Sequence, residues 1–571
     1  MKQAFSLHSS RSWLIDSCWI IFLVGVFYFS LIGLRAFTTP DEGRYAEIAR
    51  EMVVSGHYLI PTLDFAHYLQ KPPLYYWLVA GAFKLFGISD TVARVPNAFL
   101  AVLGVLLSYY FARYSYNRRT GLLTAGIIAT SLLYFVMGQS NTVDMLLSIL
   151  LAGCLYSFLW GLGQQGWRKR LALWLSYGLA GLAVLDKGLI GIVFPMMFIG
   201  TWIILRWDWG LLKRMHIPSG VIVFLLVAAP WHLLVELKAP GFLHYYFIEQ
   251  QYERYLTDVT HHVMPTWEYL SIAYFSIFPW MIVFLFSVYS LLKQGKKLIS
   301  SEATALFLLI WPLELVLFFA FSYSKLIPYL LPIIAPMAII TGRFIDQVWR
   351  DKAMGLKAMK ISVGLVGFIF LVIAVIGFNG EHWLASTLAA LDSPKQGLTA
   401  LHSLAWASIA AAIFCLISLF FKKVKIQYGA LFLASLLVLT NLAYGINPFN
   451  TRTTKAIAET VKPLLKQHPT AKVATYHIYP QDFPFYLRHQ VMVVNWHSDE
   501  FLYSLKYDRA SWQWLIKSNV FWQKWRTQPL YVLVLRDNLQ GFISQAGKIK
   551  PILITSTKRY VLVANQKVLT K

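Results

Sequence analysis

Apolar runs of about twenty residues recur along most of this chain, and they limit its fold more than any other feature. A helix of that length crosses a hydrocarbon core roughly 30 Å thick. Apolar side chains make up 57% of the 571 residues and charged side chains 14%. Soluble domains carry roughly 25% charged residues. The sequence therefore predicts an all-α polytopic membrane domain over residues 1–446.

We expect about thirteen membrane-spanning helices from these runs. Their approximate positions are 15–34, 93–112, 121–137, 143–162, 171–186, 188–205, 219–237, 268–292, 303–322, 327–344, 361–378, 403–421 and 427–446. The segment Pro72–Gly87 is apolar but short, and it contains Lys84. Its length favours an interfacial or re-entrant helix over a further span.

Lysine and arginine cluster in alternate loops between the apolar runs. The clusters are Lys2/Arg11, Arg113/Arg118/Arg119, Arg168/Lys169/Arg170, Arg206/Lys213/Arg214, Lys293/Lys296/Lys297, Arg343/Arg350/Lys352/Lys357/Lys360 and Lys422/Lys423/Lys425. Loops rich in these residues stay on the cytoplasmic side of a membrane. The alternation predicts a cytoplasmic N-terminus. With an odd number of spans, it places the C-terminal domain in a periplasm-like space.

The net charge of +24 would suggest a nucleic-acid partner if the protein were soluble. Here much of that charge lies in short loops between apolar runs, so we expect membrane lipids and phosphate groups as partners and no nucleic acid. The three cysteines, Cys18, Cys154 and Cys415, form no disulfide framework or metal motif.

Residues 447–571 have a different pattern, in which amphipathic stretches alternate with short β-like runs. The predicted helices are 455–467 and 511–525, and the predicted strands are 472–478, 491–495, 530–535, 551–554 and 560–564. This alternation predicts a soluble α/β domain at the C-terminus.

The first outward loop, residues 35–72, contains the most unusual motif, TPDEGRYAEIAREM from Thr39 to Met52. Thr39 and Glu42 have the spacing of a capping box, with Pro40 at the first helical position. Asp41 lies in the first turn, where the helix dipole favours an anion. A structural alternative assigns Glu42 to capping, Asp41 to the dipole, and Glu47 and Glu51 to ion pairs with Arg44 and Arg50 on a wet face.

The same loop ends in YLQKPPLYYW, where Lys71 precedes two prolines and is held in extended backbone. A lysine at this depth either anchors the chain at the interface or binds the phosphate of a lipid.

These two stretches resemble the membrane glycosyltransferases of GT-C fold, in the superfamily of protein O-mannosyltransferases and aminoarabinose transferases. The resemblance continues in shorter pieces over nearly the whole chain, at Asp144, Leu185–Gly188, Phe278–Trp280, Ser324–Pro332 and Asp482–Leu487. Gln70 departs from the family pattern, because many members carry glutamate there. We treat that glutamate as dispensable.

The resemblance implies roles for residues that the sequence alone leaves ambiguous. It implies catalytic roles for Asp41 and Asp144, and substrate binding by Glu42, Arg44, Lys71, Lys187, Arg254 and Tyr329. Each has a structural alternative, because Asp144 also fits a first-turn anion, Lys187 an ion pair with Asp186, and Arg254 an ion pair with Glu253 or Asp258. Tyr329 also fits an interfacial belt tyrosine.

The second outward loop, 239–267, carries His261 and His262 near several acidic residues, so a divalent metal is conceivable there. Their spacing matches no strong ligand motif, and we assign no metal ligand and no required cofactor.

The activity implied by the resemblance is an inverting transfer of 4-amino-4-deoxy-L-arabinose from undecaprenyl phosphate to lipid A. The transfer would take place at the periplasmic face of a bacterial inner membrane. Transfer of another polyprenyl-linked sugar to a glycan or protein remains open. A lipid or solute transporter, or a binding protein without activity, also remains open.

Overall fold

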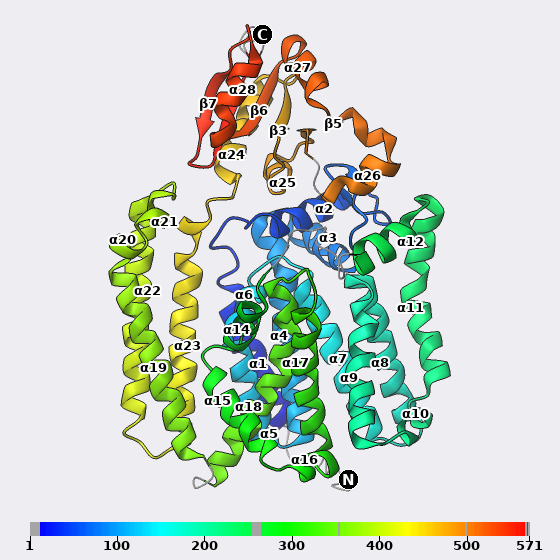
Figure 1. Ribbon diagram of the computed structural model, residues 1–571, viewed down its shortest axis with the longest axis vertical. Coiled ribbons are helices and arrows are strands. Elements are labelled where there is room, and N and C mark those ends of the chain that lie inside the picture. The colour runs from blue at the N-terminus through cyan, green and yellow to red at the C-terminus, as the bar shows by residue number, and fades with distance from the viewer. Residues whose placement is uncertain (1–11, 254–263, 352–354, 497–498, 566–567, 569–571) are drawn as a thin grey trace. The chain divides into compact units, whose positions relative to one another are not determined.

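The computed structural model describes residues 12–253, 264–351, 355–496, 499–565 and 568 (Figure 1). The chain folds into two compact units. We call the first, made of Met1–Ile32, Arg94–Phe378 and His402–Ala443, the membrane unit. The second, made of Gly33–Ala93, Asn379–Leu401 and Tyr444–Lys571, we call the mixed unit because it contains both helices and strands.

The membrane unit is helical throughout its described residues, and its long helices lie side by side in Figure 1. Its elements, of which α4 and α22 begin and α23 ends in the mixed unit, are α1 (Ser12–Phe29), α4 (Asp90–Ser115), α5 (Arg118–Ala129), α6 (Leu132–Gly138), α7 (Asp144–Leu162), α8 (Gly166–Lys187), α9 (Ile190–Arg206), α10 (Gly210–Arg214), α11 (Ile217–Lys238), α12 (Phe242–His244), η1 (Tyr245–Glu253), α14 (Thr266–Phe275), α15 (Met281–Leu292), α16 (Lys296–Ser300), α17 (Ala303–Ala320), η2 (Ile327–Ile333), α18 (Ile334–Arg350), α19 (Leu356–Phe378), α22 (Pro394–Ser418) and α23 (Val424–Gly445).

Nine helices among the described residues are long and apolar enough to cross a membrane, or ten if α5 and α6 form one span bent by 65°. The other three predicted spans also fall on helices. One of them is α8, whose first turns are basic, another is the shorter α9, and the third is divided into α14 and α15. The protein is therefore a multi-pass membrane protein, and the count of thirteen spans stays a prediction.

Ion pairs within the membrane unit test the predicted grouping of its basic loops. Arg113 and Arg118 both contact Asp16 at the start of α1, at 3.0 and 2.7 Å. Arg119 contacts Asp346 near the end of α18 at 3.4 Å. The N-terminal end of α1 and two Lys/Arg-rich loops therefore lie at the same end of this unit, as the alternation predicts.

The mixed unit combines short helices with two sheets. Its remaining elements are α2 (Asp41–Ser55), β1 (Thr62–Leu63), β2 (Ala66–His67), α3 (Leu74–Phe86), α20 (Gly380–Trp383), α21 (Ala385–Ala389), η4 (Asn447–Phe449), α24 (Lys455–Gln467), β3 (Lys472–Tyr476), α25 (Phe483–Leu487), β4 (Met492–Val494), η5 (Asp499–Phe501), α26 (Leu502–Tyr507), η6 (Arg509–Gln513), β5 (Leu515–Ile516), α27 (Ser518–Thr527), β6 (Leu530–Leu535), η7 (Arg536–Asn538), α28 (Leu539–Ala546), β7 (Ile552–Ser556) and β8 (Tyr560–Ala564).

The larger sheet has the strand order β5-β4-β3-β6-β8-β7. Strands β3, β4, β5 and β6 are parallel, and β8 and β7 continue the sheet in antiparallel pairing. Aromatic residues of α27 and α28, among them Phe521, Trp525 and Phe542, pack with the buried valines of this sheet. The predicted C-terminal α/β domain is confirmed, and all five predicted strands are present.

The helix predicted over 511–525 is wrong in its first half. The chain there forms η6 and the short strand β5, and α27 begins only at Ser518. Backbone hydrogen bonds from Val493 to Trp514 and from Asn495 to Ile516 explain the difference, because edge pairing with β4 replaces helical bonds.

The first outward loop folds together with the C-terminal residues in the mixed unit. The backbone N–H of Phe37 donates to the hydroxyl of Tyr486 at 2.8 Å, and that of Ala36 donates to Asn447 at 3.3 Å. Gly43 of α2 packs directly against the backbone of Asp482. The loop is therefore part of the folded core of this unit.

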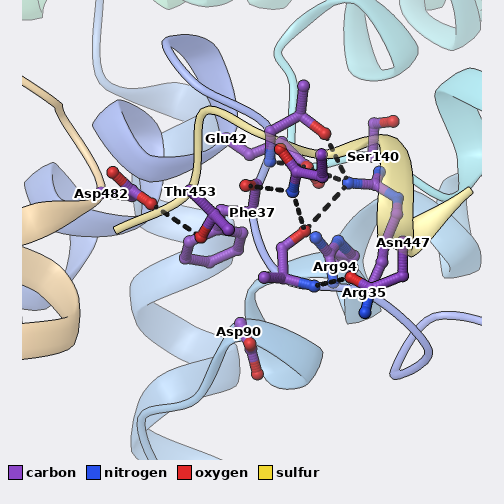
Figure 2. A network of polar contacts seen from close by, with 12 residues as sticks. Arg35, Phe37, Glu42, Asp90, Arg94, Ser140, Asn447, Thr453 and Asp482 are labelled. Atoms are coloured by element: carbon purple, nitrogen blue, oxygen red, sulfur yellow. Dashed lines mark hydrogen bonds and ion pairs between the residues drawn. The ribbon is translucent and has the colours of Figure 1, made fainter. Parts of the chain in front are cut away.

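The capping box predicted at Thr39 is wrong, although a helix does begin at Asp41. The hydroxyl of Thr39 donates to the carbonyl of Arg452 at 2.8 Å, so it does not cap α2. Glu42 instead accepts the backbone N–H of Thr38 at 2.8 Å and pairs with Arg35 (Figure 2). The carboxylate thus reaches back to the preceding turn, one residue earlier than the motif requires.

Replacing Gly43 with alanine tests this packing, because its Cβ would lie 2.6 Å from the backbone nitrogen and Cα of Asp482. We expect G43A to lower the free energy of unfolding by about 1–3 kcal/mol. The matched control is G541A in α28, where a Cβ meets nothing within 4 Å. Thermal unfolding of both variants in detergent makes the comparison, and an unchanged midpoint for G43A would contradict the packing.

Candidate active site

The described site residues form two clusters, one in each unit. We call Asp144, Lys187 and Tyr329 of the membrane unit the lysine cluster. We call Asp41, Arg44, Tyr45 and Lys71 of the mixed unit the loop cluster. Sequence positions far apart meet in each of them, so each is described by its own contacts.

The lysine cluster joins three helix ends of the membrane unit. The ammonium group of Lys187, at the end of α8, donates to Asp144 in the first turn of α7. The same nitrogen lies 4.3 Å from the ring centroid of Tyr329 in η2. Both Lys187 and Asp144 are more than nine-tenths buried. The pair therefore keeps an oriented and charge-compensated ammonium group in a low-dielectric site, where electrostatic interactions are stronger than in water.

Buried hydrogen bonds fix the turn that delivers Asp144. The side-chain amide of Asn97, in α4, donates to the carbonyls of Ser140 at 2.5 Å and Thr142 at 2.8 Å. Gly188 ends α8 with φ +88°, a conformation that favours glycine. A Cβ there would also clash with Tyr246, so the 242–253 segment packs against the turn that carries Lys187.

The lysine cluster lies at the opposite end of the membrane unit from Asp16. Helix α4 runs from Asn97, beside the start of α7, to Arg113, beside the start of α1. The predicted outward turns at Asp144, Gly188 and Tyr329 therefore share one end of this unit, and the basic loops share the other.

Arg44 is the centre of the acidic side of the loop cluster. Its guanidinium lies 3.5 Å from Asp41, one turn earlier on α2, and 2.9 Å from Glu500 in η5. Glu500 also accepts the side-chain amide of Gln481 at 2.5 Å. The Asp41 side chain remains 42% exposed, whereas Arg44 and Glu500 are largely buried. The arrangement leaves the Asp41 carboxylate accessible to solvent.

Lys71 and Tyr45 form the cationic side of the loop cluster. The ammonium group of Lys71 donates to the hydroxyl of Tyr45 and lies 4.9 Å from the centroid of its ring. Burial, together with the charge of Asp41, raises the pKa of Tyr45 well above its ordinary value. The phenol stays neutral, so Tyr45 orients the charge of Lys71 without neutralising it.

Glu42 has a structural role, although not the capping role considered for it. Its buried carboxylate pairs with Arg35 and accepts the Thr38 N–H, and both bonds hold the entry to α2 (Figure 2). A role for Glu42 in substrate binding stays a prediction.

The acidic residues farther along α2 lie in the protein interior, so the predicted wet face is wrong. Glu47 pairs with Arg50 through two hydrogen bonds of 2.6 Å. Glu51 accepts from the hydroxyl of Thr62 at 2.5 Å and from the backbone N–H of Phe65 at 3.0 Å, instead of forming a simple surface ion pair. Burial raises the pKa of Glu51 well above its ordinary value. This face of α2 packs inside the mixed unit.

Arg254, His261 and His262 lie outside the described residues. Within the part of the chain that the structure describes, no group of three or more His, Cys, Asp or Glu side chains is placed to hold a metal. Sequence reasoning missed Tyr45 as a member of the loop cluster. It also missed Glu500, which pairs with Arg44, and Gln481, which donates to Glu500. Tyr45 lies inside the recognised motif, but no local signal connects Glu500 to Arg44.

Two family descriptions match this chain. Residues 70–233 match the family described as dolichyl-phosphate-mannose-protein mannosyltransferase. Residues 457–565 match the aminoarabinose transferase C-terminal domain. The chain belongs to the superfamily of protein O-mannosyltransferases and aminoarabinose transferases. The match in the membrane segment thus names mannosyl transfer, and the match in the C-terminal domain names the aminoarabinose transferases.

Relatives named undecaprenyl phosphate-alpha-4-amino-4-deoxy-L-arabinose arabinosyl transferase are similar to this member of the superfamily. The relative from Aeromonas hydrophila is 30% identical over 369 residues, covering 64% of this chain and 66% of its own length, just under two thirds. The relative from Shewanella sediminis is 27% identical over 507 residues, covering 86% and 88%.

The crystal structure of ArnT from Cupriavidus metallidurans bound to undecaprenyl phosphate has the same fold. Its TM-score with this chain is 0.81 at 22% identity, with 97% of this chain and 98% of that chain covered. The GT-C fold predicted from the resemblance is therefore confirmed.

Gly43 packs against the backbone of Asp482. The buried carboxylate of Asp482 gives this region a pH-dependent stability. Burial raises the pKa of Asp482 to about 6, although bonds from Thr454 and Thr453 partly offset that effect. An unfolded aspartate titrates near 3.9, so the folded chain binds more protons between about pH 4 and 6. The proton on Asp482 therefore stabilises the folded protein at low pH. This contribution to the free energy of unfolding, about 3 kcal/mol, is lost as the pH rises through the window.

The variant D482N removes this titration. The compared quantity is the thermal midpoint of D482N minus that of the unchanged protein. We expect this difference to be larger at about pH 7 than at about pH 4. Unfolding followed in detergent at both pH values gives the measurement. A difference that stays constant with pH would show that Asp482 does not titrate in this range.

Proposed function

We propose that this protein is an inverting glycosyltransferase that moves 4-amino-4-deoxy-L-arabinose from undecaprenyl phosphate to lipid A. It acts at the periplasmic face of a bacterial inner membrane, with its N-terminus in the cytoplasm. The reaction breaks the bond between the sugar and the carrier phosphate and forms a new bond between the anomeric carbon and an acceptor oxygen.

The match of residues 457–565 to the aminoarabinose transferase C-terminal domain carries this proposal. The membrane match at residues 70–233 is described for mannosyl transfer and does not separate the branches. The C-terminal match favours the aminoarabinose transferases, and the relatives named as aminoarabinose transferases agree with it. Both family descriptions name transferases, which favours an enzyme over a transporter.

Departure of the carrier phosphate requires positive charge where negative charge develops, and it requires no acid. Lys187 and Lys71 are the described cations that fit this need, since each lies against a tyrosine ring with its ammonium group oriented. Asp144 keeps Lys187 in place before the phosphate arrives. Pre-oriented charges cost no reorganisation during the reaction, which makes them effective catalysts. Arg254 is a third proposed cation, carried over from the resemblance.

Asp41 acts on the acceptor in this proposal. If the acceptor is a hydroxyl group, the accessible carboxylate accepts its proton as general base. If the acceptor is a phosphate, the nucleophile is already anionic, and Asp41 instead orients the amino sugar. Direct displacement by either acceptor inverts the anomeric carbon.

Transfer of a different sugar to a glycan or protein is the second candidate, because the family matched at residues 70–233 is described for protein mannosylation. The two candidates share the lipid-linked donor and differ in sugar and acceptor.

Purified protein with a polyprenyl-phosphate aminoarabinose donor and lipid A tests the reaction directly. We expect free polyprenyl phosphate to be released only when lipid A is present. Release with a peptide or glycan acceptor instead would favour the second candidate. Absence of any release under conditions where the protein is folded would contradict both.

Substitution of the two proposed functional groups tests their roles in the same assay. We expect K71A and D41N each to lower kcat by about 100- to 1,000-fold, the range seen when one stabilising donor is removed. The matched control for Lys71 is K84A, at an exposed lysine on α3 whose ammonium group lies 4.7 Å from the ring centroid of Tyr58. The control for Asp41 is D537N on the surface of the mixed unit.

Both controls should keep full turnover. Normal kcat in K71A and D41N, with unchanged thermal midpoints, would remove these residues from the mechanism.

A further inference from the structure

An apolar groove of about 680 Å³ runs along the membrane unit, and none of its lining residues belongs to the lysine cluster or the loop cluster. Helices α1, α4, α7 and α8 line it, with leucine and isoleucine side chains such as Leu103, Leu107, Ile149 and Leu179 along most of its length. Small residues at Gly153 and Ser157 lower the α7 wall. The groove is not explained by the proposed reaction.

The length of the groove matches a lipid chain. On α4 its lining extends from Leu100 to Tyr114, and on α7 from Leu146 to Trp160. Each stretch covers about 21 Å of helix at a rise of 1.5 Å per residue. One leaflet of a bilayer has about 15 Å of hydrocarbon, so a single acyl chain fits within the groove.

The two ends of the groove differ in chemistry. Leu100 and Leu146 lie at one end, where the lining is apolar. Arg113, Tyr114 and Trp160 lie at the other. Arginine and aromatic side chains together are typical of headgroup depth. A bound lipid therefore places its headgroup at the Arg113 end.

Arg113 has hydrogen-bonding capacity left for a headgroup. Its guanidinium donates to Asp16 at 3.0 Å, to Tyr109 at 2.7 Å and to Ser12 at 3.0 Å. A guanidinium has five N–H donors, and these described contacts use three of them. Phosphate is the anion that arginine binds best through paired donors.

Basic loops near this end extend the positive charge. Arg118, which is 54% exposed, shares Asp16 with Arg113. Arg168, Lys169 and Arg170 begin α8 a few residues beyond Trp160, and Arg168 lies against the ring of Trp167. Basic pockets between spanning helices on the cytoplasmic side of a membrane bind anionic lipid headgroups, and the cytoplasmic side is the one predicted for these basic loops.

We propose that this groove binds one anionic phospholipid, with its phosphate at Arg113 and an acyl chain along α4 and α7. The site is distinct from that of the sugar carrier, because Lys187 and Asp144 lie at the opposite end of the membrane unit. The inference rests on the membrane unit alone and does not depend on the identity of the transferred sugar.

Lipid retention by the full-length protein tests the proposal. After purification in mild detergent and exchange into mixed micelles of phosphatidylglycerol and phosphatidylethanolamine, native mass spectrometry counts the retained lipid. We expect about one phosphatidylglycerol per chain, and a loss of at least tenfold in L107W, which fills the groove. The matched control is L122W, at an exposed leucine of α5 outside the groove, and it should retain the lipid.

A second measurement on the unchanged protein avoids the possibility that L107W fails to fold. Phosphatidylglycerol should raise its thermal midpoint at a concentration at least tenfold lower than phosphatidylethanolamine does. Equal shifts with the two lipids would overturn the proposal. It would also be overturned if L107W folds and retains phosphatidylglycerol, or if undecaprenyl phosphate displaces the retained lipid.

Discussion

The ion pair between Lys187 and Asp144 is the contact on which the membrane unit and its proposed chemistry depend. A charge buried among apolar helices is costly unless a partner compensates for it. Here the partner comes from a different helix, so the pair holds the ends of α7 and α8 together. The proposed reaction uses the same lysine as the cation that stabilises the departing phosphate. Pairs of Asp16 with Arg113 and Arg118 perform the same structural role at the other end of the unit. The need to compensate buried charges therefore explains which loops lie at the same end of the membrane unit. It also explains why Lys187 is held in a fixed position.

The loop cluster follows a different principle, in which C-terminal residues of the mixed unit hold the loop 35–72 in place. The residues that hold α2 and its entry come from positions about 450 residues later, including Tyr486, Asp482 and Glu500. Arg44 connects the accessible Asp41 to the buried Glu500, so the sheet-containing part of the chain positions a proposed catalytic group. This gives the C-terminal domain a physical role in the site. A domain that only covered a cavity would not need a buried carboxylate on that arginine.

Much of the fold follows from patterns that the sequence contains locally. Apolar length predicts the helices, and the alternation of short apolar runs predicts the strands from β3 to β8 except for β5, which has only two residues. The contact of Lys187 with Asp144 and Tyr329 was not predicted. The resemblance assigned each residue a role, but nothing local connects three separate helix ends. The capping box failed because Thr39 has a distant partner, Arg452, that no nearby residue reveals. The wet face assigned to Glu47 and Glu51 failed for the same reason, since burial of α2 depends on tertiary packing and not on its own sequence.

Mass spectrometry of lipid A is the most direct test of the proposed transfer of an aminopentose to lipid A. Cells that make the undecaprenyl-phosphate aminoarabinose donor but lack this protein would be compared with the same cells expressing it. We expect a new lipid A species heavier by one aminopentose in the cells that express the protein. We expect this species to be absent when the D41N variant is expressed at the same level. Lipid A of unchanged mass in cells that contain both the donor and the folded protein would contradict the proposed transfer.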